Sequence, residues 1–210
     1  MQDYYAQRAR EYDAIYLKPE RQSDLREMET WLPAELEGRT VLEIACGTGY
    51  WTQFLAPRCA HVLALDAAPQ TLEIARSRVP PATVSFAVGN AYALPASARR
   101  FDAAFAGFWW SHIPLARIGE FLAGLQRVLE PGARVVFMDN RFVAGSSTPL
   151  SQTDADGNTY QLRRLGDGSE HIVLKNFPSR GELLTAIAPF ARSTRYREWQ
   201  YFWALSFEMQ

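Results

Sequence analysis

Short apolar runs alternate with helix-like patterns along most of the chain. Five runs have the length of a buried strand, and each ends at a turn or a polar residue. They span residues 40–45, 61–65, 83–88, 101–108 and 134–138. Because helical spacing fills the intervals between them, we expect an α/β fold with a doubly wound, mostly parallel sheet and helices on both faces.

Helices are predicted where apolar residues recur every three or four positions. The predicted helices cover about 5–16, 20–31, 50–56, 69–78, 114–129 and 179–188. The segment 114–129 has the clearest single apolar face. Proline and glycine give the boundaries: Pro33 is expected to follow the second helix, and Pro131-Gly132 to end the fifth.

The alternation changes after Arg141. Residues 160–165 and 171–175 flank the turn Gly166-Asp167-Gly168-Ser169, which predicts a β-hairpin. Two aromatic strands, about 194–199 and 201–207, close the chain and bring the main sheet to seven strands. The polar stretch 145–158 is predicted to be a mobile loop.

Length and composition limit the possibilities. A chain of 210 residues with 48% hydrophobic residues suits one domain, 1–210, with N-terminal helices in 1–35 and a loop-and-hairpin insertion in 145–176. A net charge of -1 disfavours nucleic acid and anionic membranes as partners. No segment has the apolar pattern of a signal peptide or membrane span, so we expect a cytoplasmic protein. Cys46 and Cys59 are too few for a disulfide framework.

The first strand ends in a turn of small residues. Ala45, Gly47 and Gly49 would let a ligand approach the backbone, and the helix that follows points its N–H groups at the same place. Asp66 ends the second strand, where a carboxylate can accept hydrogen bonds from both hydroxyls of a ribose. The two features together predict a site for a nucleotide-like cofactor.

Two residues bear on which cofactor it is. Thr52 stands where the dinucleotide fingerprint has its third glycine, which disfavours NAD. Glu43 would repel a pyrophosphate but suits the ammonium group of S-adenosylmethionine (SAM). An NAD-dependent reductase is therefore kept only as the alternative.

Five ordered segments resemble motifs of the class I SAM-dependent methyltransferases that act on small molecules. They are 41–49, Leu65-Asp66, 89–95, 101–112 and 129–132. Ala45 replaces a frequent glycine of the first motif, and Asn90 replaces a frequent aspartate of the third. The resemblance implies a Rossmann-like fold and methyl transfer from SAM to a small-molecule acceptor, with S-adenosylhomocysteine (SAH) as product. A protein that binds SAM without turnover is the other alternative.

The resemblance also implies a set of cofactor-binding residues. They are Tyr12, Glu43, Ala45, Gly47, Gly49, Asp66, Ala67, Asn90, Ala91 and Gly107. Asn90 and Ala91 would border the adenine, with the Asn90 carbonyl as acceptor for the adenine amino group. Tyr4, Tyr5 and Tyr12 resemble a lid helix that closes over SAM, although a helix packed permanently on the sheet would give the same pattern.

The acceptor is expected at the carboxyl end of the fourth strand, where ligands bind in open α/β sheets. Tyr5, Phe108, Trp109 and Trp110 are the candidate pocket residues, and alternation along a strand lets only one of the two tryptophans face the pocket. His112 is the candidate base that removes a proton from the acceptor. Its alternative role is to cap the turn before Pro114.

No metal site is predicted. Asp139-Asn140 follows the fifth strand, but the fourth strand ends without a carboxylate that could share a hard cation. The Pro-Pro-aromatic and Pro-Cys signatures of nucleic-acid methyltransferases are also missing. We expect a monomer or homodimer with a small-molecule acceptor as its partner.

Overall fold

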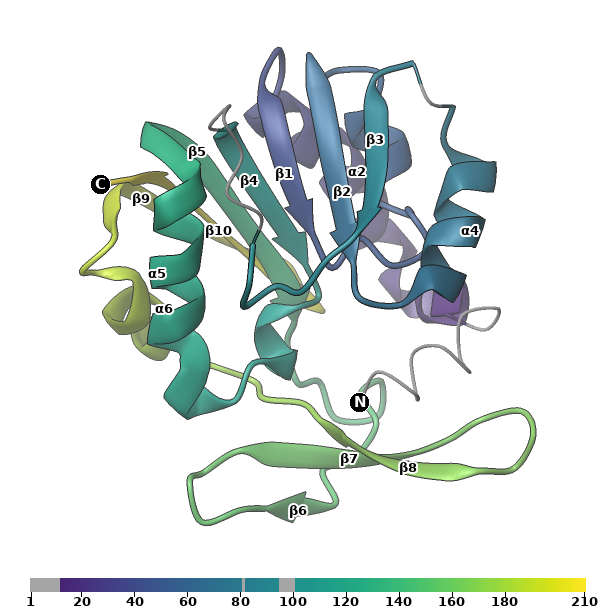
Figure 1. The fold of residues 1–210 in the computed structure, drawn as a ribbon. Helices are drawn as coiled ribbons and strands as arrows, with labels where there is room; N and C mark the ends of the chain where they lie inside the picture. Colours follow the sequence, from purple (N-terminus) through teal and green to yellow (C-terminus); the bar gives the residue numbers. More distant parts are fainter. Residues whose placement is uncertain (1–11, 81, 95–100) are drawn as a thin grey trace.

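The main sheet has seven strands. The computed structural model describes residues 12–80, 82–94 and 101–210. Its sheet strands are β1 (Thr40–Ile44), β2 (His61–Asp66), β3 (Val84–Val88), β4 (Phe101–Gly107), β5 (Leu129–Asn140), β9 (Ala191–Glu198) and β10 (Phe202–Met209). The spatial order is β3-β2-β1-β4-β5-β10-β9, and β10 alone runs antiparallel to its neighbours (Figure 1). The predicted fold class is confirmed.

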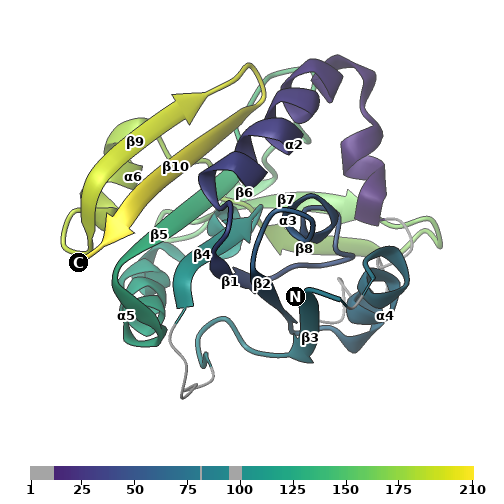
Figure 2. The same cartoon turned by 90° about the horizontal axis from the view of Figure 1, so that it is seen from above.

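Helices cover both faces of this sheet. They are α2 (Gln22–Glu35), α3 (Thr52–Leu55), α4 (Pro69–Arg78), α5 (Ile118–Val128) and α6 (Arg180–Ile187). Buried residues of α2, α3 and α4 share one core with Val41 of β1, whereas those of α5 and α6 share the other with Leu42. Figure 2 shows α2 and α5 on opposite sides of the sheet. Successive strand residues thus feed two separate cores.

Short 3-10 helices make several connections. They are η1 (Tyr12–Leu17), η2 (Pro19–Arg21), η3 (Trp110–His112) and η4 (Leu115–Arg117). The predicted first helix of 5–16 lies mostly outside the described residues, and its described part is 3-10 rather than α-helical. Pro114 precedes η4, so the predicted helix 114–129 is divided into η4 and α5.

A three-stranded antiparallel sheet forms the insertion. It consists of β6 (Gln152–Thr153), β7 (Thr159–Arg164) and β8 (Glu170–Leu174), in that order. In Figure 1 the hairpin β7–β8 lies below the carboxyl ends of the parallel strands. Within the preceding loop, Ser146 is buried and its hydroxyl accepts a hydrogen bond from Arg21 Nε at 3.0 Å. Loop 145–158 therefore has fixed contacts, and its mobility stays a prediction.

Two predicted boundaries were wrong. Helix α2 continues through Pro33 to Glu35, because Pro33 lies in the last turn and is buried with Leu32. There the missing N–H costs one hydrogen bond, while burial of the ring compensates. Strand β5 begins at Leu129 instead of 134, and Gly132, with φ of +81°, allows the chain to stay extended past the proline.

Candidate active site

A cavity of about 370 Å³ lies at the carboxyl ends of the central strands. Nine of its lining residues were predicted from the sequence: Ala45, Gly47, Asp66, Ala67, Asn90, Ala91, Phe108, Trp109 and His112. A volume of this size is within the range of small-molecule sites. The predicted cofactor end and the predicted acceptor end therefore belong to one continuous cavity.

The turn after β1 is left-handed at three positions. Ala45, Gly47 and Gly49 have φ of +55°, +56° and +74°. A non-glycine residue at positive φ is strained, and such strain gathers at functional sites. The turn is fixed to β2, because the Gly47 N–H donates to Asp66 Oδ2 at 2.8 Å.

Asp66 is held in place by its own surroundings. Its second oxygen, Oδ1, accepts hydrogen bonds from the Ala68 N–H at 2.9 Å and from the Thr71 hydroxyl at 3.1 Å. Burial raises the pKa of Asp66, and these hydrogen bonds oppose that rise. The carboxylate is thus oriented toward the cavity before any ligand binds.

Aromatic residues wall the other end of the cavity. Phe108, at the end of β4, has φ of +58°, and its ring contacts Tyr16 of η1 edge-on at 5.8 Å between centroids. Trp109 lines the cavity, whereas Trp110 is 2% exposed and packs on Phe137 in the core. Trp110 is therefore not a pocket residue. Both tryptophans follow the end of β4 at Gly107, and Trp110 begins η3, so the alternation expected for a strand does not apply to them.

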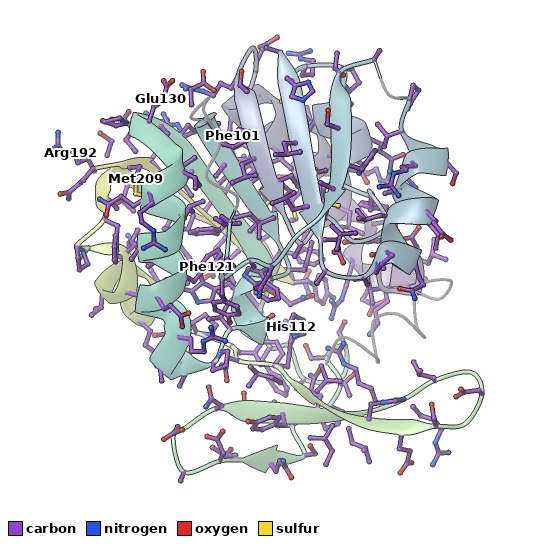
Figure 3. All side chains as sticks on the ribbon, in the orientation of Figure 1. Phe101, His112, Phe121, Glu130, Arg192 and Met209 are labelled. Carbon is purple, nitrogen blue, oxygen red and sulfur yellow. The ribbon has the colours of Figure 1, made fainter. Side chains whose placement is uncertain are left out.

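His112 lies between the sheet and the hairpin (Figure 3). Its Nδ1 is 2.7 Å from the carbonyl oxygen of Leu174, at the end of β8. A carbonyl can only accept, so the proton lies on Nδ1 and Nε2 carries the lone pair. Burial and the positive charges of Lys175 and Arg163 hold the pKa of His112 well below its usual value. The N-cap residue of η4 is Pro114, and no side chain caps that helix.

Comparisons with known proteins agree with this geometry. Residues 41–132 match the family model described as a methyltransferase domain. The structure superposes on the DhpI–SAH complex with a TM-score of 0.81 and 28% identity, covering 99% of this chain and 94% of that one. The DhpI–SAM–HEP complex gives 0.79 and 25%, covering 98% and 94%. These likenesses support a class I SAM-dependent methyltransferase.

Among curated methyltransferases, the malonyl-[acyl-carrier protein] O-methyltransferase of Serratia marcescens is 30% identical over 154 residues, covering 72% of this chain and 53% of that protein. The magnesium-protoporphyrin O-methyltransferase of Rhodobacter capsulatus is 47% identical over 62 residues, 28% of each chain. The chain spans between 20% and 53% of the length of the first three curated relatives it matches.

The residues of this methyltransferase fit its cofactor. Ala45 and Gly47 leave the backbone of the first turn accessible, Asp66 offers an oriented carboxylate for the ribose, and Leu65 and Ala91 give apolar surface for a base. These are the features that an adenosine group needs. The cavity therefore fits SAM as cofactor and SAH as the product of methyl transfer.

Apart from Tyr12, three predicted cofactor residues lie outside the cavity lining. Gly49 allows close packing on α4, since an added Cβ would lie 3.0 Å from that of Ala75. Gly107 leaves room for the ring of Phe105, which would be 2.8 Å from an added Cβ. Glu43 is 1% exposed, and burial raises its pKa to about 8. Burial thus favours the protonated carboxyl over the carboxylate that would attract an ammonium.

The structure describes little of the two N-terminal tyrosines that were predicted to contact acceptor and cofactor. Tyr5 lies outside the described residues, and for Tyr12 only the backbone, in η1, is described. A neighbouring residue contacts the cofactor turn: Asp13 Oδ1 accepts a hydrogen bond from the Thr48 hydroxyl at 2.6 Å, and Oδ2 pairs with Arg78. The N-terminal segment is thus bonded to the turn beside the cavity.

The sequence did not reveal a buried ion pair next to His112. Lys175 Nζ donates to Asp139 Oδ1 at 2.9 Å and to the Ser111 hydroxyl at 2.5 Å, while the Ser111 N–H donates to Asp139 Oδ2. Burial raises the pKa of Asp139, but Lys175, His112 and the Ser111 N–H together outweigh burial and leave this pKa below its usual value. The Asp139 considered for a metal is occupied by an ammonium. Among the described residues, no group of three or more His, Cys, Asp or Glu could hold a metal ion.

Proposed function

We propose that this protein transfers the methyl group of SAM to a small-molecule acceptor. One observation carries the proposal: the turn at Gly47 and the carboxylate of Asp66 share a cavity with Trp109 and His112. When bound, SAM supplies a methyl group already activated by its sulfonium. The protein then needs to align the acceptor and to exclude water, which a walled cavity can do.

His112 is proposed as the base. Its Nδ1–H is fixed by the Leu174 carbonyl, which leaves Nε2 as the atom that accepts a proton from an acceptor hydroxyl or amine. The lowered pKa of His112 keeps the ring neutral, and therefore able to accept, at neutral pH. The hairpin would thus position the base while the sheet positions the cofactor.

Location, oligomeric state and partners are proposed as well. We propose a cytoplasmic enzyme, monomeric or homodimeric, that does not act on nucleic acid. The net charge of -1 supports the last point. Among the described residues, no helix could cross a membrane. Light scattering after gel filtration would give the oligomeric state.

Two experiments test the function. Thermal shifts with SAH, SAM and NADH should show stabilisation by the first two only, since ligands that bind the native state raise its melting temperature. Incubation of the protein and methyl-labelled SAM with a fractionated metabolite extract should then yield a labelled product. SAM binding without a labelled product from any fraction would instead favour a non-catalytic SAM-binding protein, and stabilisation by NADH alone a reductase.

A further inference from the structure

Arg117 and Tyr92 stack on each other at one end of the cavity. The guanidinium carbon of Arg117 is 3.6 Å from the centroid of the Tyr92 ring, and both residues line the cavity. Tyr92 adjoins Asn90 and Ala91, the residues that the family resemblance places beside the adenine. The stack therefore belongs to the base end of the cavity.

The position of Arg117 is fixed without a ligand. Its Nε and one terminal nitrogen donate to the two carboxylate oxygens of Glu120 at 2.7 and 2.8 Å. The helix that carries Arg117, η4, is held at its start by Asn158, whose side-chain oxygen accepts the Leu115 N–H at 2.8 Å. Two-point pairing orients the plane of a guanidinium, which a single contact would not do.

The neighbouring asparagine is already engaged. Asn90 Oδ1 accepts a hydrogen bond from the Tyr92 N–H at 2.9 Å, within its own turn. The sequence assigned that oxygen to the adenine amino group, but here it holds Tyr92 beneath Arg117. Because an amide oxygen has two lone pairs, Asn90 can still accept from a base, and the Arg117–Tyr92 stack forms the wall beside it.

We propose that the Arg117–Tyr92 stack is a specificity element that closes the base end of the cavity. In adenine the exocyclic amine lies across the ring system from the bond to ribose. A cofactor whose ribose is held at Asp66 therefore points this amine toward the far end. The stack excludes cofactors with bulky groups on the amine, an inference that rests on the proposed SAM-dependent function.

The test compares two ligands on three proteins. Affinities for SAH and for SAH with a benzyl group on the adenine amine are measured by calorimetry for the wild type, Arg117→Ala and Arg117→Lys. We expect the wild type to bind the benzyl compound at least about 30-fold more weakly than SAH, and Arg117→Ala to reduce this ratio about tenfold. Arg117→Lys should behave like Arg117→Ala, because an ammonium cannot reproduce the planar stack with its two-point pairing.

Arg127→Ala is the matched control, an exposed arginine on α5 that does not line the cavity. It should keep the wild-type ratio. An unchanged ratio in Arg117→Ala overturns the inference, and so does a wild-type ratio in Arg117→Lys, which would assign the effect to charge. A wild-type protein that binds no SAH would instead overturn the proposed function. This result is distinct from the two outcomes that overturn the role of Arg117.

Discussion

The imidazole of His112 donates its Nδ1 proton to the carbonyl of Leu174, 62 residues further along the chain. The tautomer of the ring is thus set by the hairpin, not by the helix that carries the histidine. A base whose proton is held on one nitrogen presents the other to the acceptor in a defined direction.

Replacement of this base separates binding from chemistry. His112→Ala should lower kcat by about 10² to 10⁴, the usual contribution of a general base, while SAH affinity stays nearly unchanged. The wild-type kcat/KM should rise with pH through a pKa well below 6.5 and be flat near pH 7, because the folded state disfavours the charged ring. A variant that keeps the wild-type rate and the same rising limb would rule out the assignment.

Asp66→Ala should weaken SAH binding by about 1.5 to 3 kcal/mol, the range for hydrogen bonds to a charged group. Titration calorimetry measures the loss, and circular dichroism checks the fold, since Asp66 also holds Gly47. Thr71→Val is the control: it removes one hydroxyl donor to Asp66 and keeps the carboxylate. If a folded Asp66→Ala protein bound SAH as the wild type does, the ribose role would be lost.

Lys175→Met should lower the free energy of unfolding by about 3 to 5 kcal/mol, because it leaves Asp139 buried without its partner. Urea denaturation gives the value. The double variant Lys175→Met/Asp139→Asn should recover part of that loss, since no unpaired charge remains. Simple additivity of the two single changes would mean that the pair is not coupled.

Glu43→Gln is expected to stabilise the protein increasingly with pH. The pKa of Glu43 is about 8 when folded and near 4.5 when unfolded, so the native state binds an extra proton between these values. Stability from this group is fully present below 4.5 and is lost as pH rises to about 8. The melting temperature of the variant should therefore exceed that of the wild type by more at pH 8 than at pH 5. Glu73→Gln, an exposed site on α4, should show no such trend.

Asp13→Ala should speed the dissociation of SAH about two- to fivefold, as expected from loss of a partly exposed ion pair. The reason is that Asp13 joins η1 to Thr48 in the turn beside the cavity. Stopped-flow displacement measures the rate. Asp13→Asn keeps an acceptor for Thr48 and should lie between the two proteins; equal rates in all three would show that η1 does not retain the cofactor.

The sequence predicted what depends on local pattern. The apolar run that stops at Asp66 predicted the end of β2, and Pro69 predicted the start of α4. Both boundaries were found where expected. The contacts of His112 with Leu174 and of Lys175 with Asp139 join residues 62 and 36 positions apart. No local periodicity encodes such pairs, because they arise only when the hairpin folds back on the sheet.

The burial of single side chains was also beyond local pattern. Glu43 lies in an apolar run, and nothing in that run indicated that its carboxyl would be enclosed rather than open to the ligand. The choice between Trp109 and Trp110 was beyond it too, because both residues follow the end of β4 and the alternation of a strand does not extend to them.

The ion pair between Lys175 and Asp139 limits how this protein could acquire a new acceptor. The hairpin carries the cation and β5 carries the anion, so an insertion exchanged for one without a cation at 175 would leave a charge stranded in the interior. Change is easier at Leu162 and Ile172, paired across the hairpin and exposed to solvent. Divergence of substrate range should therefore begin at the exposed residues of the hairpin. Lys175, where the hairpin ends, should change only together with Asp139 of the sheet.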